Sequence, residues 1–340
     1  MSSPTHHPLT AASRDNAPEL RRLGHSGLTV SAIGLGCNNL GRTHTATESL
    51  KVSTTVVRAA IDAGITLFDV ADNYGKTPGV SEEFLGKALG SQRENVIVAT
   101  KFGMNNAGIS GPDFGARGSR AYIMRCVEGS LRRLNTDYID LYQHHTPDLH
   151  TPIDETLSAL DDLITQGKVR YIGHSNRSGW QVAQAEYVAR ELGTARFISS
   201  QNHYNLLDRR AELEIVPAAQ EFGLGVLPYF PLANGLLTGK YSKNNAPADG
   251  RVTHSKPELL ETAPWDALAQ LEDFARERNM TLLEVAFSWL AAQPVVSSVI
   301  AGATSIAQIN QNAQAIHPLS VDDRAVIDSI FPPPARIALF

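Results

Sequence analysis

Cysteine is scarce in this sequence of 340 residues, and long runs of one chemical character are missing. The two cysteines, Cys37 and Cys126, are too few for a disulfide framework and are typical of a reducing compartment. No apolar run approaches the roughly 20 residues needed to cross a bilayer. No run of Lys and Arg exceeds two residues, so we expect neither a membrane nor a nucleic acid as a partner.

The charge balance and the N-terminal residues indicate a cytoplasmic protein. The net charge is −5 and the sequence pI is about 6.1. Residues 1–18 lack the apolar stretch of a secretory signal and are expected to form a disordered tail. We expect a single domain over residues 19–330 and a C-terminal tail over residues 331–340.

Short apolar runs recur along the chain, and several are nearly continuous rather than alternating. Such runs are typical of parallel strands that are buried on both faces. The predicted strands are Ala32–Cys37, Thr66–Val70, Val96–Lys101, Tyr138–Gln143, Val169–His174, Phe197–Gln201, Gly225–Pro228 and Ser298–Ile300.

Longer amphipathic stretches separate these strands and predict helices. Eight strands that alternate with helices favour a (β/α)8 TIM barrel over an open, doubly wound sheet. Two short apolar segments around Gly24 and Gly27 predict a β-hairpin that plugs the bottom of the barrel. The predicted helices are Lys51–Ala63, Ser81–Leu89, Arg120–Leu134, Ile153–Thr165, Gly179–Leu192, Arg210–Phe222, Trp265–Arg278, Leu282–Ala292 and Ile306–Ala315.

Polar residues follow nearly every predicted strand, at the end where the active sites of such barrels are built. A single polar residue there would be unremarkable, whereas a full ring of them indicates a site. The residues at or just after the strand ends are Asp69, Tyr74, Lys101, His145, Ser175, Asn176, Gln201, Tyr229 and Gly302.

Four of these side chains have complementary proton chemistry. A free tyrosine has a pKa of about 10 and is a poor acid near neutrality. We expect the Lys101 ammonium to lower the pKa of Tyr74, and Asp69 to hold the lysine in place. His145 can donate a hydrogen bond to an oxygen that gains negative charge.

The order and spacing of seven motifs resemble those of the aldo-keto reductases, especially the bacterial branch similar to the potassium-channel β subunits. The resemblance extends from about residue 21 to about residue 315. The motifs are Phe68–Gly75 (FDVADNYG), Ala99–Lys101 (ATK), Asp137–His145 (DYIDLYQHH), Gly173–Asn176 (GHSN), Gln201–Asn205 (QNHYN), Gly235–Tyr241 (GLLTGKY) and Gly302–Ser305 (GATS).

The resemblance implies a catalytic tetrad and a nicotinamide site. The tetrad would be Asp69, Tyr74, Lys101 and His145, with Tyr74 as the general acid. His145 is preferred to His144 because the family pattern is Gln, any residue, then His. By the same match, Ser175, Asn176 and Gln201 would bind the carboxamide of the nicotinamide, and Tyr229 would stack on its ring.

The cofactor implied by the resemblance is NADPH, with NADH as the alternative. Many members that prefer NADPH carry a basic residue where this chain has Thr304 and Ser305, so the preference stays open. Phosphate binding after the last two strands, at a helix N-terminus, also agrees with the physics of barrels. The residues expected to reach the cofactor phosphates are Lys240, Arg251, Gly302, Thr304, Gln308 and Asn312.

The substrate-pocket residues are less constrained by the sequence. Two long loops, residues 103–118 and 242–264, are expected to border the pocket, because long loops in compact domains are often functional. Asn38 and Asn39 follow the first strand and favour a polar substrate. The other expected wall residues are Phe102, Met104, Phe114, His144 and Phe230.

These observations predict a metal-free enzyme that reversibly reduces an aldehyde or ketone with NADPH. Gly34–Cys37 lacks the third glycine of a Rossmann fingerprint. A second hypothesis is a cofactor-sensing regulatory subunit of the channel-β type, and a third, remote one is a metal-dependent hydrolase. The substrate remains open among sugars, phosphorylated trioses, pyridoxal-like aldehydes and xenobiotic aldehydes, as does the oligomeric state.

Overall fold

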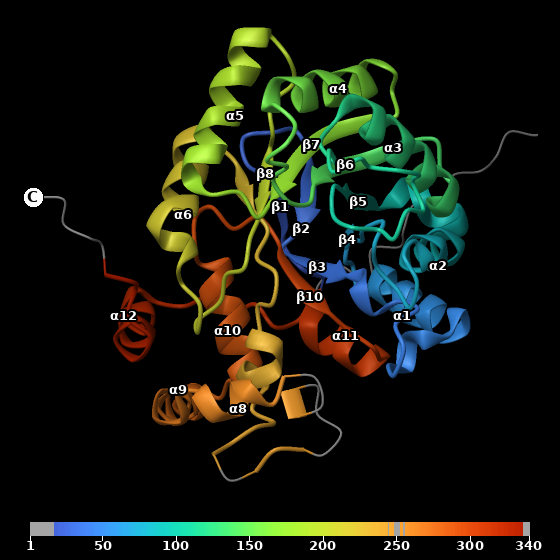
Figure 1. The fold of residues 1–340 in the computed structure, drawn as a ribbon. Coiled ribbons are helices and arrows are strands. Elements are labelled where there is room, and N and C mark those ends of the chain that lie inside the picture. The colour runs from blue at the N-terminus through green and yellow to red at the C-terminus, as the bar shows by residue number, and fades with distance from the viewer. Residues whose placement is uncertain (1–16, 244, 248–251, 254–255, 336–340) are drawn as a thin grey trace, which may run out of the picture.

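The computed structural model describes residues 17–243, 245–247, 252–253 and 256–335. Eight parallel strands alternate with helices that lie around them (Figure 1). The strands are β3 Ile33–Gly36, β4 Leu67–Asp69, β5 Ile97–Phe102, β6 Ile139–His144, β7 Val169–Ser175, β8 Ser199–Gln201, β9 Gly225–Val226 and β10 Val299–Gly302.

The sheet closes on itself between its first and last strands. The strand order is β10-β3-β4-β5-β6-β7-β8-β9. Ser297 N donates to Val226 O at 3.1 Å, and Ile300 N donates to Pro228 O at 3.1 Å, so the β10 segment is bonded to the β9 segment. This pairing confirms the predicted (β/α)8 barrel.

The predicted hairpin is also confirmed. β1 (Leu20–Arg22) pairs with β2 (Thr29–Ser31) in antiparallel register. Leu23, Leu28 and Val30 are buried with inward-facing residues of the barrel strands, so the hairpin closes one end of the barrel. Gly24 has φ +58°, and a Cβ there would lie 2.4 Å from Gly223 O, which explains the need for glycine at this tight approach.

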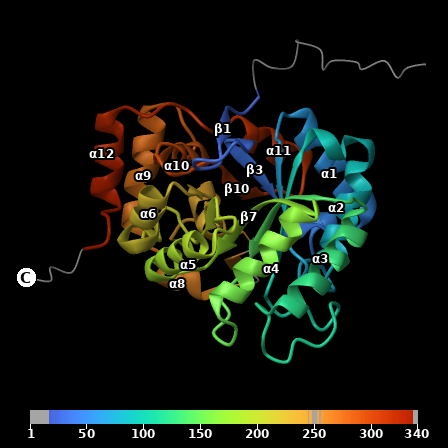
Figure 2. The same ribbon diagram turned by 90° about the horizontal axis from the view of Figure 1, so that it is seen from above.

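The helices cover the outside of the barrel, as the view from above shows (Figure 2). Eight of the nine predicted helices begin and end within one residue of the prediction, and the ninth, α11, ends two residues early, at Ala313 rather than Ala315. The helices are α1 Leu50–Asp62, α2 Val80–Leu89, α3 Arg120–Leu134, α4 Ile153–Thr165, α5 Gly179–Leu192, α6 Ala211–Phe222, α8 Glu258–Thr262, α9 Trp265–Glu277, α10 Leu282–Ala291, α11 Ile306–Ala313 and α12 Val321–Ile330.

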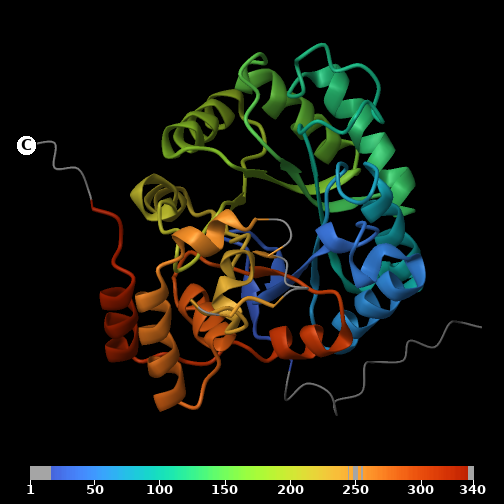
Figure 3. The ribbon, with the colours of Figure 1, turned by 60° about the horizontal axis from the view of Figure 1, so that its bottom comes forward.

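Among the described helices whose bounds are given above, α8 and α12 were not predicted. α12 lies beside α9 on one side of the barrel (Figures 2 and 3). It begins with a capping box, in which Ser320 Oγ accepts from Asp323 N and Asp323 accepts from Ser320 N. This Ser-x-x-acid pattern is a helix-start signal that the sequence contained. α8 is a five-residue helix within the loop predicted over residues 242–264.

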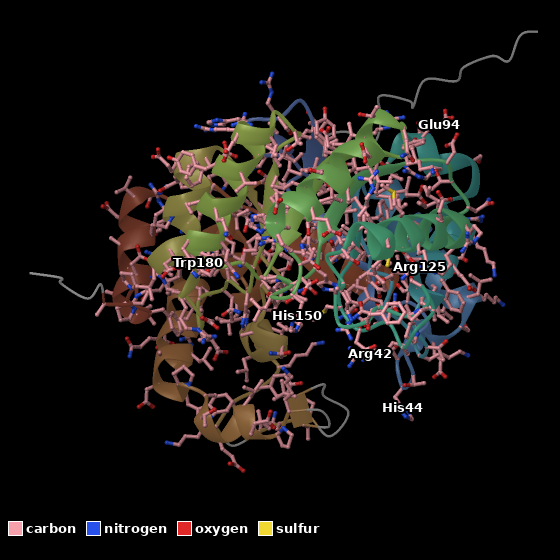
Figure 4. All side chains as sticks on the ribbon, turned by 45° about the horizontal axis from the view of Figure 1, so that its top comes forward. Arg42, His44, Glu94, Arg125, His150 and Trp180 are labelled. Atoms are coloured by element: carbon pink, nitrogen blue, oxygen red, sulfur yellow. The ribbon has the colours of Figure 1, made fainter. Side chains whose placement is uncertain are left out.

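All strand-to-helix loops emerge at one end of the barrel, because the strands are parallel. In Figure 4, Arg42, His44 and His150 lie toward this end. Glu94, in a helix-to-strand connection, lies at the opposite end (Figure 4). The residues at the ends of the predicted strands therefore all lie at this end of the barrel.

At the opposite end, Asp140 joins three segments. It is 4% exposed, and its Oδ2 accepts from Val98 N at 3.0 Å. The same oxygen lies 2.7 Å from Nη2 of Arg93 in an ion pair. The Asp140 carboxylate is the counter-ion of Arg93 and the acceptor for Val98 N. It is therefore a stabilising link between β5, β6 and the segment before β5.

Replacing Asp140 with Ala should lower the free energy of unfolding by about 3 kcal/mol, since it leaves the buried Arg93 guanidinium without its counter-ion and the buried Val98 N–H without an acceptor. Urea denaturation at neutral pH measures the change. The matched control is Asp137→Ala, because Asp137 is exposed three residues earlier. A loss for Asp140→Ala no greater than that of the control would contradict this role.

Candidate active site

A buried ion pair lies at the loop end of the barrel. Lys101 is 0% exposed and Asp69 is 3% exposed. Lys101 Nζ donates to Asp69 Oδ2 at 2.7 Å and to Val70 O at 2.9 Å. Asp69 ends β4 and Lys101 lies on β5, so the pairing of adjacent strands brings the two side chains together.

Two amides hold the other oxygen of the same carboxylate. Gln201 Nε2 donates to Asp69 Oδ1 at 2.8 Å, and Gln143 Nε2 donates to it at 3.2 Å. Gln201 reaches Asp69 from β8, across the barrel. Gln143 has no role in the sequence analysis, although it is a polar residue on the strand face that also buries Leu141 inside the barrel.

The turn after β4 brings Tyr74 to this ion pair. Tyr74 N donates to Ala71 O at 3.2 Å, and Gly75 has φ +110°, a conformation that favours glycine. Lys101 Nζ lies 5.1 Å from the centre of the Tyr74 ring. The ring of His145 meets the Tyr74 ring edge-on, with 5.8 Å between centres. The four expected residues therefore meet around one point.

The proton affinities of these groups follow from burial and from one another. Burial raises the pKa of Tyr74, although the Lys101 charge acts to lower it. Our expectation of a net lowering is wrong, because burial outweighs the ammonium. Burial acts to lower the pKa of Lys101, but Asp69 and Tyr74 more than offset it, so that pKa is raised. Near neutral pH the site therefore holds a protonated phenol and an ammonium.

His145 is a neutral imidazole in this environment. Burial and the nearby Lys101 charge hold the pKa of His145 well below its ordinary value. Its Nδ1 is buried without a hydrogen-bond partner. A neutral imidazole still carries one N–H and can donate one hydrogen bond.

A second polar group lies on the neighbouring strands β7 and β8. Ser175 Oγ donates to Gln201 O at 2.8 Å. Asn176 Nδ2 donates to His145 O at 3.0 Å, and Asn176 Oδ1 accepts from Tyr229 Oη at 2.8 Å. The four residues expected to bind nicotinamide are thus linked to one another and to the segment that carries His145.

The segment after β10 forms a capped helix start. Ser305 Oγ accepts from Gln308 N at 3.3 Å, at the N-terminus of α11. Gln308 Oε1 accepts from Thr304 N at 2.7 Å. Asn312 is buried and its Nδ2 lies 3.5 Å from Gly302 O. These contacts order the segment in which phosphate binding was expected.

The two basic residues expected to bind the cofactor phosphates, Lys240 and Arg251, have fewer defined contacts. Lys240 is exposed just after a 3-10 segment, Ala233–Thr238, and its backbone N donates to Thr238 Oγ1 at 3.4 Å. Arg251 lies outside the described residues.

Two of the expected pocket residues lie behind the barrel wall. Phe102 and His144 are 0% and 1% exposed, and their rings stack with 4.9 Å between centres. Side chains alternate along a strand, so Phe102 points away from the side occupied by Lys101. His144 Nδ1 lies 2.9 Å from Nη2 of the buried Arg177. In this structure the two rings fill the layer between strands and helices and do not line a pocket.

The other expected pocket residues remain near the loops. Asn38 and Phe230 are half-buried, and Phe230 has φ +53°. Met104 is half-buried, and its Sδ accepts from Asn73 Nδ2 at 3.7 Å. Phe114 is 88% exposed at the tip of its loop.

The described residues lack two features, a membrane-spanning helix and a metal-binding cluster. No helix of that part of the chain is long and apolar enough to cross a membrane. No group of three or more His, Cys, Asp or Glu side chains in the same ranges is arranged to hold a metal ion.

The fold and the site together define a parallel β/α barrel with a preformed acid–base cluster at the loop ends of its strands. The model of the aldo/keto reductase family matches residues 32–331. The chain belongs to this family.

Several proteins of known sequence resemble the chain over nearly its whole length. An uncharacterised oxidoreductase, YrpG, of Bacillus subtilis (strain 168) is 37% identical over 327 residues, 93% of this chain and 97% of YrpG. The L-glyceraldehyde 3-phosphate reductase of Escherichia coli (strain K12) is 34% identical and covers 91% of both chains. A probable voltage-gated potassium channel subunit beta of Oryza sativa subsp. japonica is 36% identical, over 92% of this chain and 95% of its own.

The neutral state of His145 can be observed directly. Its ring carbon and proton resonances should not shift between pH 5 and pH 8, because its pKa lies well below that range. NMR of histidine-labelled protein measures the titration, with His145→Gln to assign the signal. A His145 signal that shifts between pH 5 and pH 8 would contradict the assignment.

Proposed function

We propose that this protein reduces an aldehyde or ketone to an alcohol, reversibly, with hydride from NADPH and a proton from Tyr74. The observation that carries the proposal is the Lys101–Asp69 ion pair, fully buried beside a phenol that keeps its proton. A buried ion pair is costly to assemble and is weak evidence for stability alone. Its position against a tyrosine and a histidine favours a catalytic purpose.

The donor set fits a nicotinamide dinucleotide. A hydroxyl and two amides, from Ser175, Asn176 and Gln201, match the hydrogen-bonding needs of a carboxamide. The half-buried ring of Tyr229 offers an aromatic face beside them, and the start of α11 offers backbone N–H groups to phosphate. When bound, the nicotinamide would supply hydride to the carbonyl carbon.

The side chains of this chain would handle the proton and the developing charge. The carbonyl oxygen would lie between the Tyr74 hydroxyl and the His145 ring, and it would gain negative charge as hydride arrives. Tyr74 would give its proton to that oxygen. Lys101, held by Asp69, would stabilise the phenolate that Tyr74 leaves behind. His145, being neutral, would donate a hydrogen bond without competing as an acid.

The substrate that we propose is a small polar aldehyde. The relative named L-glyceraldehyde 3-phosphate reductase acts, by its name, on an aldehyde of this kind. Asn38 supports the same choice, since it offers an amide just after the end of β3. β3 pairs with β4, the strand that precedes the Tyr74 turn.

Replacing Tyr74 with Phe should lower kcat by a factor of about 10² to 10⁴, the usual contribution of a general acid. The affinity for NADPH should stay unchanged, because the ring is kept. Steady-state kinetics and cofactor fluorescence measure the two quantities. Tyr187→Phe, on the exposed face of α5, is the matched control. Unchanged turnover in Tyr74→Phe would remove the proposed acid.

A cofactor-sensing subunit is the second candidate, favoured by the similarity to the rice channel subunit. Titration with NADPH and with NADH, followed by an aldehyde panel with the cofactor that binds more tightly, separates the two candidates. We expect tighter binding of NADPH and many turnovers per protein molecule. A single slow oxidation of bound cofactor with every aldehyde would favour the sensor, and tighter binding of NADH would overturn the cofactor preference.

A further inference from the structure

A fully buried acid outside the tetrad lies two residues before Tyr74. Asp72 is 0% exposed. Its backbone N donates to Lys101 O at 3.3 Å, so the turn that carries Tyr74 is fastened at Asp72 to the strand that carries Lys101. The reaction derived above makes no use of the Asp72 carboxyl group.

The Asp72 side chain reaches a different part of the molecule, the loop over residues 103–118. Asn106 Nδ2 donates to Asp72 Oδ2 at 2.8 Å and to Ser110 Oγ at 3.0 Å. Asn106 is 2% exposed and Ser110 is 7% exposed. The Asp72 carboxylate therefore holds the loop from inside at Asn106. Arg125 on α3 also holds it, donating from Nε to Ser110 O at 3.0 Å and from Nη2 to Pro112 O at 2.6 Å.

A second contact joins the same two segments. Asn73, the residue between Asp72 and Tyr74, donates from Nδ2 to Met104 Sδ at 3.7 Å. Two consecutive residues of the Tyr74 turn thus bond to the loop, while the Asp72 backbone bonds to β5. Movement of the loop would be transmitted to the tyrosine through these bonds.

The charges around Asp72 come from every element packed against it. Glu82 on α2 acts to raise its pKa, whereas Arg133 on α3 and Lys101 on β5 act to lower it. Cys126 and Tyr122 on α3 and Tyr142 on β6 are the other titratable groups, and the pKa of each is raised chiefly by burial. Asp72 Oδ1 and Tyr142 Oη are both buried without a hydrogen-bond partner.

We propose that Asp72 is a positioning residue that sets the place of Tyr74 relative to Lys101 by holding the loop over residues 103–118 through Asn106. This inference rests on the proposed reductase function. The ionised carboxyl group makes the stronger bond, since a charge-assisted hydrogen bond is roughly twice as strong as a neutral one. Burial and Glu82 raise the pKa of Asp72 to about 7, so the strength of this bond changes near neutral pH.

The decisive variants separate the hydrogen bond from the charge. Asn106→Ala removes the bond and keeps the Asp72 carboxyl group, and Asp72→Ala removes both. Asp72→Asn keeps an acceptor oxygen for Asn106 and removes the charge. Asn105→Ala is the matched control, because Asn105 is the exposed neighbour whose side-chain oxygen accepts from Ala107 N in the same loop.

Asn106→Ala and Asp72→Ala should lower kcat by a factor of about 10 to 100, the cost of a small misplacement of a catalytic group, with unchanged affinity for NADPH. The kcat of Asn105→Ala should stay within about twofold of that of the unmodified protein, and steady-state kinetics can resolve this difference. In the unmodified protein kcat should rise with pH through an inflection near 7, and this inflection should be absent in Asp72→Asn. A kcat for Asn106→Ala equal to that of Asn105→Ala, or an inflection that survives in Asp72→Asn, would overturn the proposal.

Two further readouts need no turnover, so they keep this inference separate from the proposed function. Asn106→Ala should speed trypsin cleavage after Arg117, within the loop, compared with Asn105→Ala, and equal cleavage would count against the pinned loop.

The second readout is stability. An unfolded aspartate has a pKa of about 3.9, so between that pH and about 7 the folded protein binds more protons at Asp72 than the unfolded chain does. The Asp72 contribution to the free energy of unfolding therefore falls as pH rises through this range, and Asp72→Asn should lack this fall.

Discussion

The Lys101–Asp69 ion pair is the interaction on which the rest of the site depends. Two charges without water are costly unless every oxygen and every N–H is bonded. Asp69 meets this condition with one bond from Lys101 on β5 and two from the amides of Gln143 on β6 and Gln201 on β8. One carboxylate thus ties strands from opposite sides of the barrel, and the closed barrel is what makes this possible. A flat sheet would keep β4 and β8 apart.

Burial of this ion pair also decides the chemistry of its neighbours. The low-dielectric surroundings keep the Tyr74 phenol protonated and His145 neutral, and Lys101 lies close enough to stabilise a phenolate once the proton has left. The proposed transfer of a proton from Tyr74 needs a protonated phenol, a neutral His145 and a nearby ammonium at the same time. The same burial makes Asp72, beside the Tyr74 turn, sensitive to pH near neutrality.

The two ends of the barrel use buried charge for different purposes. At the hairpin end, Asp140 bonds to Arg93 and to Val98 N and fastens adjacent segments. At the loop end, the buried Lys101–Asp69 pair lies beside the rings of Tyr74 and His145. This division agrees with the general separation of stability and activity in parallel β/α barrels, and the Asp72–Asn106 bond extends the loop-end network outward into the loop over residues 103–118.

The sequence alone determined the strands, most of the helices and the end of the barrel at which Asp69, Tyr74, Lys101 and His145 meet, because apolar runs specify strands buried on both faces and parallel strands end at one rim. It did not distinguish Phe102, which points into the helix layer, from Lys101, which points inward, since that difference is a matter of register across the barrel. Gln143 and Asp72 lie within motifs of the resemblance, but the sequence did not give their contacts with Asp69 and Asn106, because a buried amide or acid acquires its role from partners distant in the chain. The direction of the Tyr74 pKa shift likewise depended on tertiary structure, since burial, which sequence spacing does not measure, outweighs the charge of Lys101.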